Sequence, residues 1–120
     1  MGDWRPKFKP GQAITRSATA TITGGQLVTV AGAVAAADSV TWLGVADKDV
    51  TSGNQFGVLC GGVQYLTAAG AISAGTSVKC AANGQVTTFV DGTDAMLRFV
   101  GIALDAATNA GDVIAVRMAR

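Results

Sequence analysis

Histidine and glutamate are both missing from this chain of 120 residues. The lack of histidine removes the commonest general base and the commonest metal ligand. Acid–base or nucleophilic chemistry would have to come from eight aspartates and from Cys60 and Cys80, which have neither Cys-x-x-Cys spacing nor a histidine to activate them. The sequence therefore predicts a protein that is not an enzyme and that holds no metal and no cofactor.

Long apolar runs and a strong charge of one sign are also absent. No apolar run approaches the roughly 18 residues of a membrane helix, and no apolar segment follows the charged N-terminus as in a signal peptide. The net charge is only +1, and no basic stripe continues beyond residue 16. We expect a cytosolic product with no membrane or nucleic-acid partner, in which Cys60 and Cys80 are buried thiols rather than a disulfide.

Two segments resemble ligand-binding motifs but lack the residue that each motif needs. "GAISAGTS" (residues 70–77) has the glycine spacing and final serine of a phosphate-binding loop, but Thr76 stands where the lysine must be. "DKDVTSGN" (residues 47–54) opens like a calcium loop, but Ser52 replaces the turn glycine and Val58 replaces the bidentate glutamate. Both segments are predicted to be ordinary turns, and the second leaves room for a weak cation site.

β-Branched residues and glycines dominate what is present, with 14 Val, 13 Thr and 16 Gly. Short apolar or alternating runs bounded by Gly, Asn or Asp predict strands, and nothing predicts a long helix. The Asn83-Gly84 pair between apolar flanks predicts a tight hairpin. The predicted strands are residues 18–23, 27–31, 40–47, 55–59, 63–66, 77–80, 86–89, 97–104 and 113–118.

An internal repeat makes the prediction of fold more specific. Residues 42–60, "WLGVADKDVTSGNQFGVLC", align with residues 99–118, "FVGIALDAATNAGDVIAVRM", and 24–30 align with 74–80, with a few extra residues in the second unit near "VDGTD". We expect a single all-β domain over residues 17–120, a small β-barrel or sandwich with a pseudo-two-fold internal repeat, each half closing the other's edges. The alternative is that strands rich in Gly, Ala and Val resemble one another by composition alone.

The first sixteen residues differ from the rest and are predicted to form an extended N-terminal arm, residues 1–16. Both prolines and four of the nine basic residues lie here. Pro6 and Pro10 favour extended backbone, in which alternation places Trp4 and Phe8 on one side and cations on the other. Trp and Arg are enriched at interface hot spots. The residues predicted to bind a partner protein are therefore Trp4, Arg5, Lys7, Phe8 and Lys9. Two alternatives stay open: Trp4 and Phe8 fold back onto their own barrel, or the terminus is frayed.

Several segments together carry a resemblance to a known family. They are "KPGQAIT", "GGQLVTVAG", "WLGVADKDVTSGNQFGV", "GGVQYL", "AISAGTSVKCAANGQV" and "FVGIALDAATNAGDVIAVRM". With their Gly-[Val/Ile]-Ala strands and closing Gly-Asp…Val-Arg unit, residues 9–120 resemble the bacteriophage capsid decoration, or cement, proteins. The arm is the part least like that family.

The resemblance implies a β-barrel-like structural protein of the virion, assembled in the host cytoplasm, that binds the outer surface of an icosahedral head and stabilises the shell. Its implied partners are the major capsid protein and other copies of itself, as a homotrimer at three-fold or quasi-three-fold positions. In this interpretation the arm grips neighbouring capsid subunits. The alternative is a minor virion or tail-associated module that recognises a glycan or a host surface.

Overall fold

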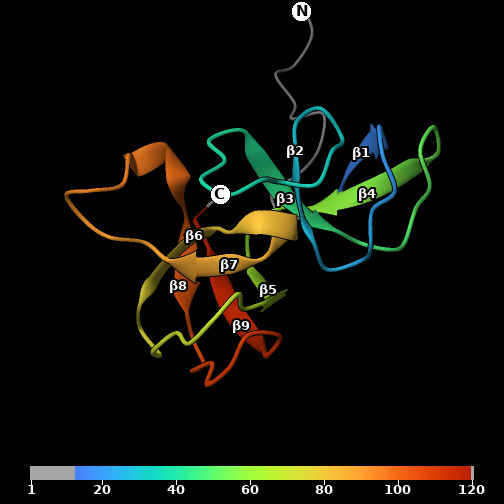
Figure 1. Ribbon diagram of the computed structural model, residues 1–120. Coiled ribbons are helices and arrows are strands. Elements are labelled where there is room, and N and C mark those ends of the chain that lie inside the picture. The colour runs from blue at the N-terminus through green and yellow to red at the C-terminus, as the bar shows by residue number, and fades with distance from the viewer. Residues whose placement is uncertain (1–12, 120) are drawn as a thin grey trace, which may run out of the picture.

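Two antiparallel sheets contain every strand in the described part of the chain, which is residues 13–119 of the computed structural model (Figure 1). One sheet has the order β1-β4-β3-β2 and the other has the order β5-β9-β8-β6-β7. The elements are β1 (Ile14–Ser17), β2 (Leu27–Thr29), β3 (Trp42–Ala46), β4 (Gln55–Leu59), β5 (Val63–Thr67), β6 (Ser77–Cys80), the 3-10 turn η1 (Ala82–Gly84), β7 (Val86–Thr88), the 3-10 turn η2 (Met96–Arg98), β8 (Phe99–Ala103) and β9 (Val113–Met118). The prediction of an all-β fold is confirmed.

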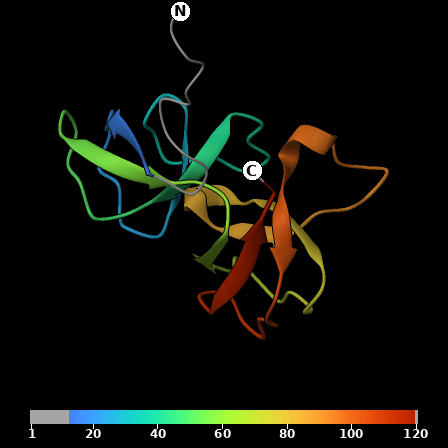
Figure 2. The same cartoon turned by 180° about the vertical axis from the view of Figure 1, so that it is seen from behind.

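The two sheets divide the chain into an N-terminal half, residues 13–60, and a C-terminal half, residues 63–119. Figure 1 shows the strands coloured blue to green on one side of the molecule and those coloured yellow-green to red on the other. Figure 2, the reverse view, shows the same division. Only residues 60–62 separate the end of β4 from the start of β5. The halves are therefore adjacent lobes joined by a very short link.

The two halves have the same pattern of strand pairing. In the N-terminal half β2 pairs with β3, in the C-terminal half β6 pairs with β8, and the two pairs have a bulge at matching places, after Val28 and after Val78. β1 pairs along β4 as β5 pairs along β9. Isolated bridges match as well, Ile22 with Val50 and Ile72 with Ala107. The predicted internal repeat is confirmed in the backbone hydrogen bonding.

Two glycines hold equivalent places in this pattern, Gly44 in β3 and Gly101 in β8. A Cβ atom at Gly44 would lie 2.3 Å from the carbonyl oxygen of Leu59, and one at Gly101 would lie 2.2 Å from that of Arg117. Both distances are far shorter than a van der Waals contact, and the obstacle is backbone that cannot turn aside. The glycine shared by the two Gly-[Val/Ile]-Ala strands is therefore a packing requirement of both halves.

Each half closes its sheet on itself. In the N-terminal half the Thr19 N–H donates to the carbonyl of Gly32, with N···O 3.1 Å, and a Cβ at Gly32 would lie 2.1 Å from the carbonyl oxygen of Ser17. In the C-terminal half the Ala69 N–H donates to the carbonyl of Val86 at 2.8 Å. Each unit thus brings its later hairpin back beside its own first strand. The expectation that each half closes the other's edges is wrong.

One predicted strand is displaced. The sequence predicts a first strand at residues 18–23, whereas β1 is Ile14–Ser17. The Ala18 N–H donates to the carbonyl of Asn54 at 2.8 Å, and four residues later Ile22 bridges Val50. The alternating segment therefore meets its neighbour at separate points instead of running along it. Each of the other eight predicted strands overlaps an observed one.

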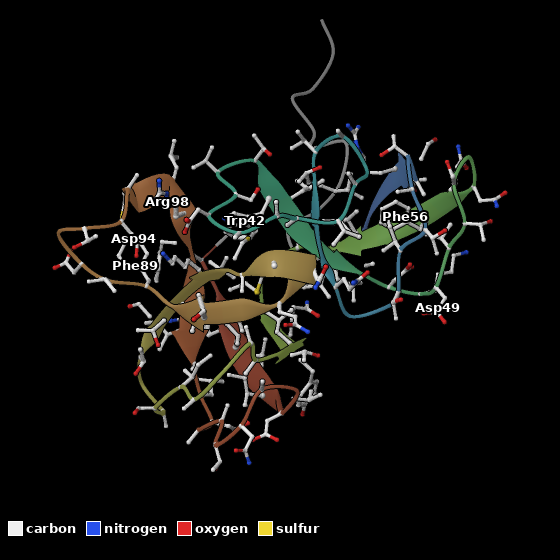
Figure 3. The ribbon with its side chains drawn as sticks, in the orientation of Figure 1. Trp42, Asp49, Phe56, Phe89, Asp94 and Arg98 are labelled. Atoms are coloured by element: carbon white, nitrogen blue, oxygen red, sulfur yellow. The ribbon has the colours of Figure 1, made fainter. Side chains whose placement is uncertain are left out.

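Buried side chains form two clusters, one of which spans the boundary between the halves. The cluster confined to the N-terminal half includes Phe56. The larger cluster combines the interior of the C-terminal half with Leu27, Ala35, Trp42 and Val45 of the N-terminal half. Figure 3 shows Trp42 near the middle of the molecule, between Phe56 in one lobe and Phe89 in the other. The halves are therefore joined by a common apolar core.

The tip of the β6–β7 hairpin seals the junction between the halves. Asn83 has φ 61° and ψ 31°, and Gly84 has φ 68°, which fits the tight turn expected of an Asn-Gly pair. The Gly84 N–H donates to the carbonyl of Ala35 at 3.0 Å, and the Gln26 side-chain amide donates to the carbonyl of Asn83 at 3.0 Å. The predicted hairpin is confirmed, and its tip packs on the other half.

Candidate binding surfaces

The five arm residues predicted to bind a partner lie outside the described residues 13–119. They are Trp4, Arg5, Lys7, Phe8 and Lys9. The described chain begins at the edge of the four-stranded sheet, where β1 pairs along β4 with Ile14 opposite Val58 and Ser17 opposite Gln55. Residues 14–16, the end of the segment predicted to be an arm, therefore belong to β1.

Arg16 is the last basic residue of the first sixteen, and its guanidinium makes a contact within the chain. The Arg16 Nε donates to the carbonyl oxygen of Val30 at 2.9 Å, and its Nη2 donates to the same oxygen. This side chain ties β1 to the hairpin that follows β2. The Arg16 guanidinium therefore forms its hydrogen bonds within the N-terminal half.

A long loop projects from the C-terminal half. Residues 89–98 connect β7 to β8 and include η2, whereas the matching connection in the N-terminal half, residues 35–41, is shorter. Figure 1 shows the loop, in orange, extending away from the rest of the molecule. The extra residues predicted near "VDGTD" are thus confirmed, and they lengthen this loop in the C-terminal half alone.

Asp94 anchors this loop to the body. Its Oδ1 lies 2.7 Å from the Lys79 Nζ and 3.0 Å from the Arg98 Nη1, and its Oδ2 accepts a hydrogen bond from the Val90 N–H at 2.8 Å. The Lys79 Nζ also lies 2.8 Å from the Asp38 Oδ1 in the N-terminal half. The Asp94 side chain is only 3% exposed. The network therefore holds the loop against both β6 and the other half.

The same network shifts the pKa of two groups. The hydrogen bond from Lys79, followed by that from the Val90 N–H, lowers the pKa of Asp94 from its ordinary 3.8 to about 2. Hydrogen bonds to Asp38 and Asp94 raise the pKa of Lys79 above its ordinary 10.5. Both shifts show that the network stabilises the charged form of each group. Figure 3 shows Asp94 and Arg98 close together at the base of the loop.

An open hollow of about 330 Å³ lies beside this anchored loop. It is lined by Ser77, Phe89, Asp91, Met96 and Phe99. The rings of Phe89 and Phe99 meet edge to face, with centroids 5.7 Å apart and an interplanar angle of 64°. Met96 is 75% exposed and its neighbour Leu97 is also exposed. A projecting loop with exposed Met and Leu side chains beside an aromatic hollow can hold an apolar side chain of a partner protein.

A second apolar surface covers the outer side of the five-stranded sheet, and we call it the apolar outer face. Its members are Val63, Tyr65, Ile102, Leu104 and Val113, all of them exposed. Tyr65, 70% exposed, lies opposite Ala115 of β9, and the Leu104 N–H donates to the Ala115 carbonyl at 2.8 Å. The three strands β5, β9 and β8 therefore place these side chains on one surface, where Arg117 of β9 lies between Val63 and Ile102.

The aspartates that resemble a calcium loop form turn contacts instead. The Asp47 Oδ1 accepts a hydrogen bond from the Gly57 N–H at 3.0 Å, and the Asp49 Oδ1 accepts one from the Gly24 N–H at 2.7 Å. Within residues 13–119, no three His, Cys, Asp or Glu side chains are grouped so that they could hold a metal ion. Across the same described residues, no helix has both the length and the apolar character to cross a membrane.

The two cysteines are thiols rather than a disulfide, as predicted. Cys80 is buried, whereas Cys60 is only partly buried. The Cys60 Sγ lies 3.7 Å from the Leu43 carbonyl oxygen and 3.6 Å from that of Val58. Burial raises the pKa of the Cys60 thiol, which keeps it protonated at neutral pH.

Sequence reasoning missed the ion pairs that anchor the loop, and it missed the apolar outer face. Tyr65 lies inside a strand, as predicted, but "VQYLT" has apolar residues on both sides of the pleat and does not show which side is buried. β9, "VIAVRM", is apolar at all but one position, so its sequence does not show which residues face outward either. The cluster of Asp38, Lys79 and Asp94 joins three distant segments, and no spacing in the sequence signals it.

Comparisons with known proteins fit this architecture. Among solved structures, the head fiber gp8.5 N base of bacteriophage phi29 matches with a TM-score of 0.69 at 19% sequence identity, covering 89% of this chain and 92% of that chain. At this identity the match supports the fold alone. No curated protein sequence matches the chain. A family model described as "Phage cement protein" matches residues 8–118. Because that match spans nearly all of the sequence, the chain belongs to the phage cement protein family.

Proposed function

We propose that this protein binds the outer surface of an icosahedral phage head and stabilises the shell, with its N-terminal arm gripping neighbouring capsid subunits. Family membership carries the coarser statement, that this is a capsid-associated structural protein of a phage virion. The finer proposal names the major capsid protein as partner and a homotrimer at three-fold or quasi-three-fold positions as the bound form.

The observation that best supports a docking role is the use of the carboxylates. Five aspartates of the described chain accept hydrogen bonds from backbone N–H groups, some of them in the same turn and others in a neighbouring segment, namely Asp47, Asp49, Asp94, Asp105 and Asp112. Carboxylates that accept such hydrogen bonds stabilise the loops and strand ends around them. Exposed apolar side chains, such as Met96, Leu97 and Tyr65, thus stand on a body whose loops are held in place, which suits a module that docks.

The anchored loop supplies one body contact with the shell in this proposal. Met96 and Leu97 project from it, and the hollow lined by Phe89 and Phe99 lies beside them. The ion pairs of Asp94 hold the loop in place before binding, so little conformational entropy is lost on docking. The loop is therefore suited to insert into the seam between two shell subunits.

The arm supplies the second contact. Trp4 and Phe8 enter apolar crevices on an adjacent subunit, and the cations Arg5, Lys7 and Lys9 pair with acidic groups of the shell. Each contact is modest, but many copies bind one lattice, and trimer formation links three arms together. Linked contacts raise the overall affinity well above that of a single arm.

Cosedimentation with undecorated phage heads tests the proposal. We expect the full chain to bind saturably and a variant lacking residues 2–10 to bind at least about 100-fold more weakly, with unchanged far-UV circular dichroism. The double variant Trp4→Ala/Phe8→Ala should weaken binding at all salt concentrations. The triple variant Arg5→Gln/Lys7→Gln/Lys9→Gln should weaken binding mainly at low salt, where charge attraction is least screened. Lys48→Gln, an exposed cation of the body, is the matched control and should bind like the wild type.

Two outcomes would overturn the proposal. Equal occupancy of heads by the full chain and by the variant lacking residues 2–10 would remove the arm from the mechanism. No binding by any variant would remove the shell as partner and leave the host-surface or glycan module, which glycan binding by the full chain would then test.

A further inference from the structure

The apolar outer face has a counterpart in the N-terminal half, because the two halves pair their strands in the same register. Ile102 occupies in β8 the place that Val45 occupies in β3. The matching neighbours are Leu27 and Leu59 for Val45, and Ser77 and Arg117 for Ile102. The two surfaces can therefore be compared position by position.

The two surfaces differ in what covers them. Val45 is 3% exposed and, with Leu27, belongs to the buried cluster that the N-terminal half shares with the C-terminal half, while Leu59 packs against that cluster. Ile102 is 40% exposed, and Val63, on the other side of Arg117 in the same sheet, is 51% exposed. The N-terminal half thus buries Val45 against the C-terminal half, whereas the C-terminal half leaves the matching Ile102 partly exposed.

The rest of the surface also departs from its counterpart. Tyr65, Leu104 and Val113 stand at the places that Thr15, Asp47 and Gln55 hold in the N-terminal half. All six are exposed, yet one set is apolar and the other is polar. In a stack of repeated units, the end unit that meets only water has a polar outer side. The N-terminal half has such a side and the C-terminal half does not.

We propose that a second copy of this chain covers the apolar outer face, which is then the self-association surface of the protein. The inference rests on the proposed function for the expectation of a homotrimer, and it adds the surface through which the copies meet. At the junction inside the chain, Val45, the counterpart of Ile102, packs against another unit of the same fold. A second copy seated on the apolar outer face would cover Ile102 as the C-terminal half covers Val45.

The composition of the face agrees with a permanent interface between copies. Its five members are aliphatic or aromatic, and the centres of such interfaces are rich in aromatic side chains and poor in Asp, Glu and Lys. Tyr65 is the largest and the most exposed of them, so it is the expected anchor. Arg117, opposite both Val63 and Ile102, adds a cation for which the second copy must provide an acceptor.

Sedimentation equilibrium of the full chain and of four single variants tests this inference. Tyr65→Asp and Val113→Asp place a carboxylate in the apolar outer face. Thr15→Asp and Gln55→Asp place the same group at the matching positions of the N-terminal half, as controls. We expect the wild type and both controls to associate, and the first two variants to raise the dissociation constant at least about 100-fold with unchanged circular dichroism.

The outcomes that would overturn the inference are distinct from those that concern the shell. A wild type that stays monomeric up to about 1 mM, or a Tyr65→Asp variant that associates like the wild type, would overturn it. Loss of association on deleting residues 2–10, with Tyr65→Asp still associating, would assign the contact to the arm. Association that depends on Tyr65 and Val113 would sustain the inference even if the wild type failed to bind heads, in which case the proposed function alone would fall.

Discussion

The two halves of this protein have one backbone plan and two kinds of surface. The bulges, the isolated bridges and the closing hydrogen bonds occur at matching places in both. The differences are a longer hairpin at residues 80–86, a longer loop at residues 89–98 and the apolar outer face, all of them in the C-terminal half. These three differences lie outside the shared network of backbone hydrogen bonds.

This contrast shows which residue positions the structure of the barrel constrains and which positions can vary. In the core, Phe56 of the N-terminal half occupies the position that Ile114 occupies in the C-terminal half. Such a change of size is tolerated when the neighbouring side chains repack. Gly44 and Gly101 are identical because a backbone carbonyl oxygen lies against each of them. Backbone contacts thus fix the unit, and the outward residues are free to acquire different partners.

Among the variants that test this comparison, Trp42→Ala should have the largest effect on the free energy of unfolding. Trp42 is buried in the junction, and its counterpart Phe99 lines the open hollow. We expect Trp42→Ala to lower the free energy of unfolding by about 4 kcal/mol and Phe99→Ala by about 1.5 kcal/mol, because only the first leaves a closed cavity. Urea denaturation followed by far-UV circular dichroism measures both. Equal losses of unfolding free energy in the two variants would contradict the expectation that Trp42 contributes more to stability than Phe99.

Alanine at the paired glycines comes next. Gly44→Ala and Gly101→Ala should each lower the free energy of unfolding by about 3 kcal/mol, because each new Cβ meets a carbonyl oxygen. Gly70→Ala is the control, since a Cβ atom at Gly70 would meet no atom within 4 Å. We expect the control to change stability by less than about 1 kcal/mol. A clear difference between the first two variants would contradict the equivalence of the halves.

Acid should act on the anchored loop, which only one half has. Because the folded pKa of Asp94 lies at about 2, below its ordinary 3.8, the stability that this group contributes is present above pH 3.8 and is lost as the pH falls toward 2. The stability difference between the wild type and Asp94→Asn should therefore be clear at pH 7 and shrink at pH 2. An NMR titration of the Asp94 carboxyl with a midpoint near 3.8 would instead show that its ion pairs do not form.

The smallest effect concerns the thiols. Cys60 is partly exposed with a raised pKa, and Cys80 is buried. A thiol reagent at pH 8 should label Cys60 slowly and Cys80 only after unfolding in denaturant. Mass spectrometry of labelled peptides distinguishes the two sites. Labelling of Cys80 first in the folded protein would contradict the packing of β6 against the core.

Much of the fold could be predicted from the sequence because the signals for it are local. Alternating and apolar runs between Gly, Asn and Asp predicted eight of the nine strands, and Asn83-Gly84 predicted its hairpin. The first strand was displaced because the alternation in "ATATIT" does not say whether a segment runs along its neighbour or only touches it. The closure of each half on itself depends on contacts such as Thr19 with Gly32, which have no signal in the sequence.

The binding surfaces were harder to predict, since they depend on which side of a strand is covered. Ile102 and Val45 are both β-branched residues in equivalent strands, and only the arrangement of the halves leaves one exposed and buries the other. The ion pairs of Lys79 join residues from both halves. The role of the arm stays a prediction, because Trp4 and Phe8 lie outside the described residues.

The short link at residues 60–62 has a consequence for how such a protein can change over generations. A single reading frame encodes two barrels in a fixed one-to-one ratio, and each is close enough to find the other without competition from foreign chains. Mutations at exposed outward positions, such as Tyr65 and Val113, leave the buried contacts between the two barrels untouched. A lineage can therefore change these positions while the shared core continues to hold the two barrels together.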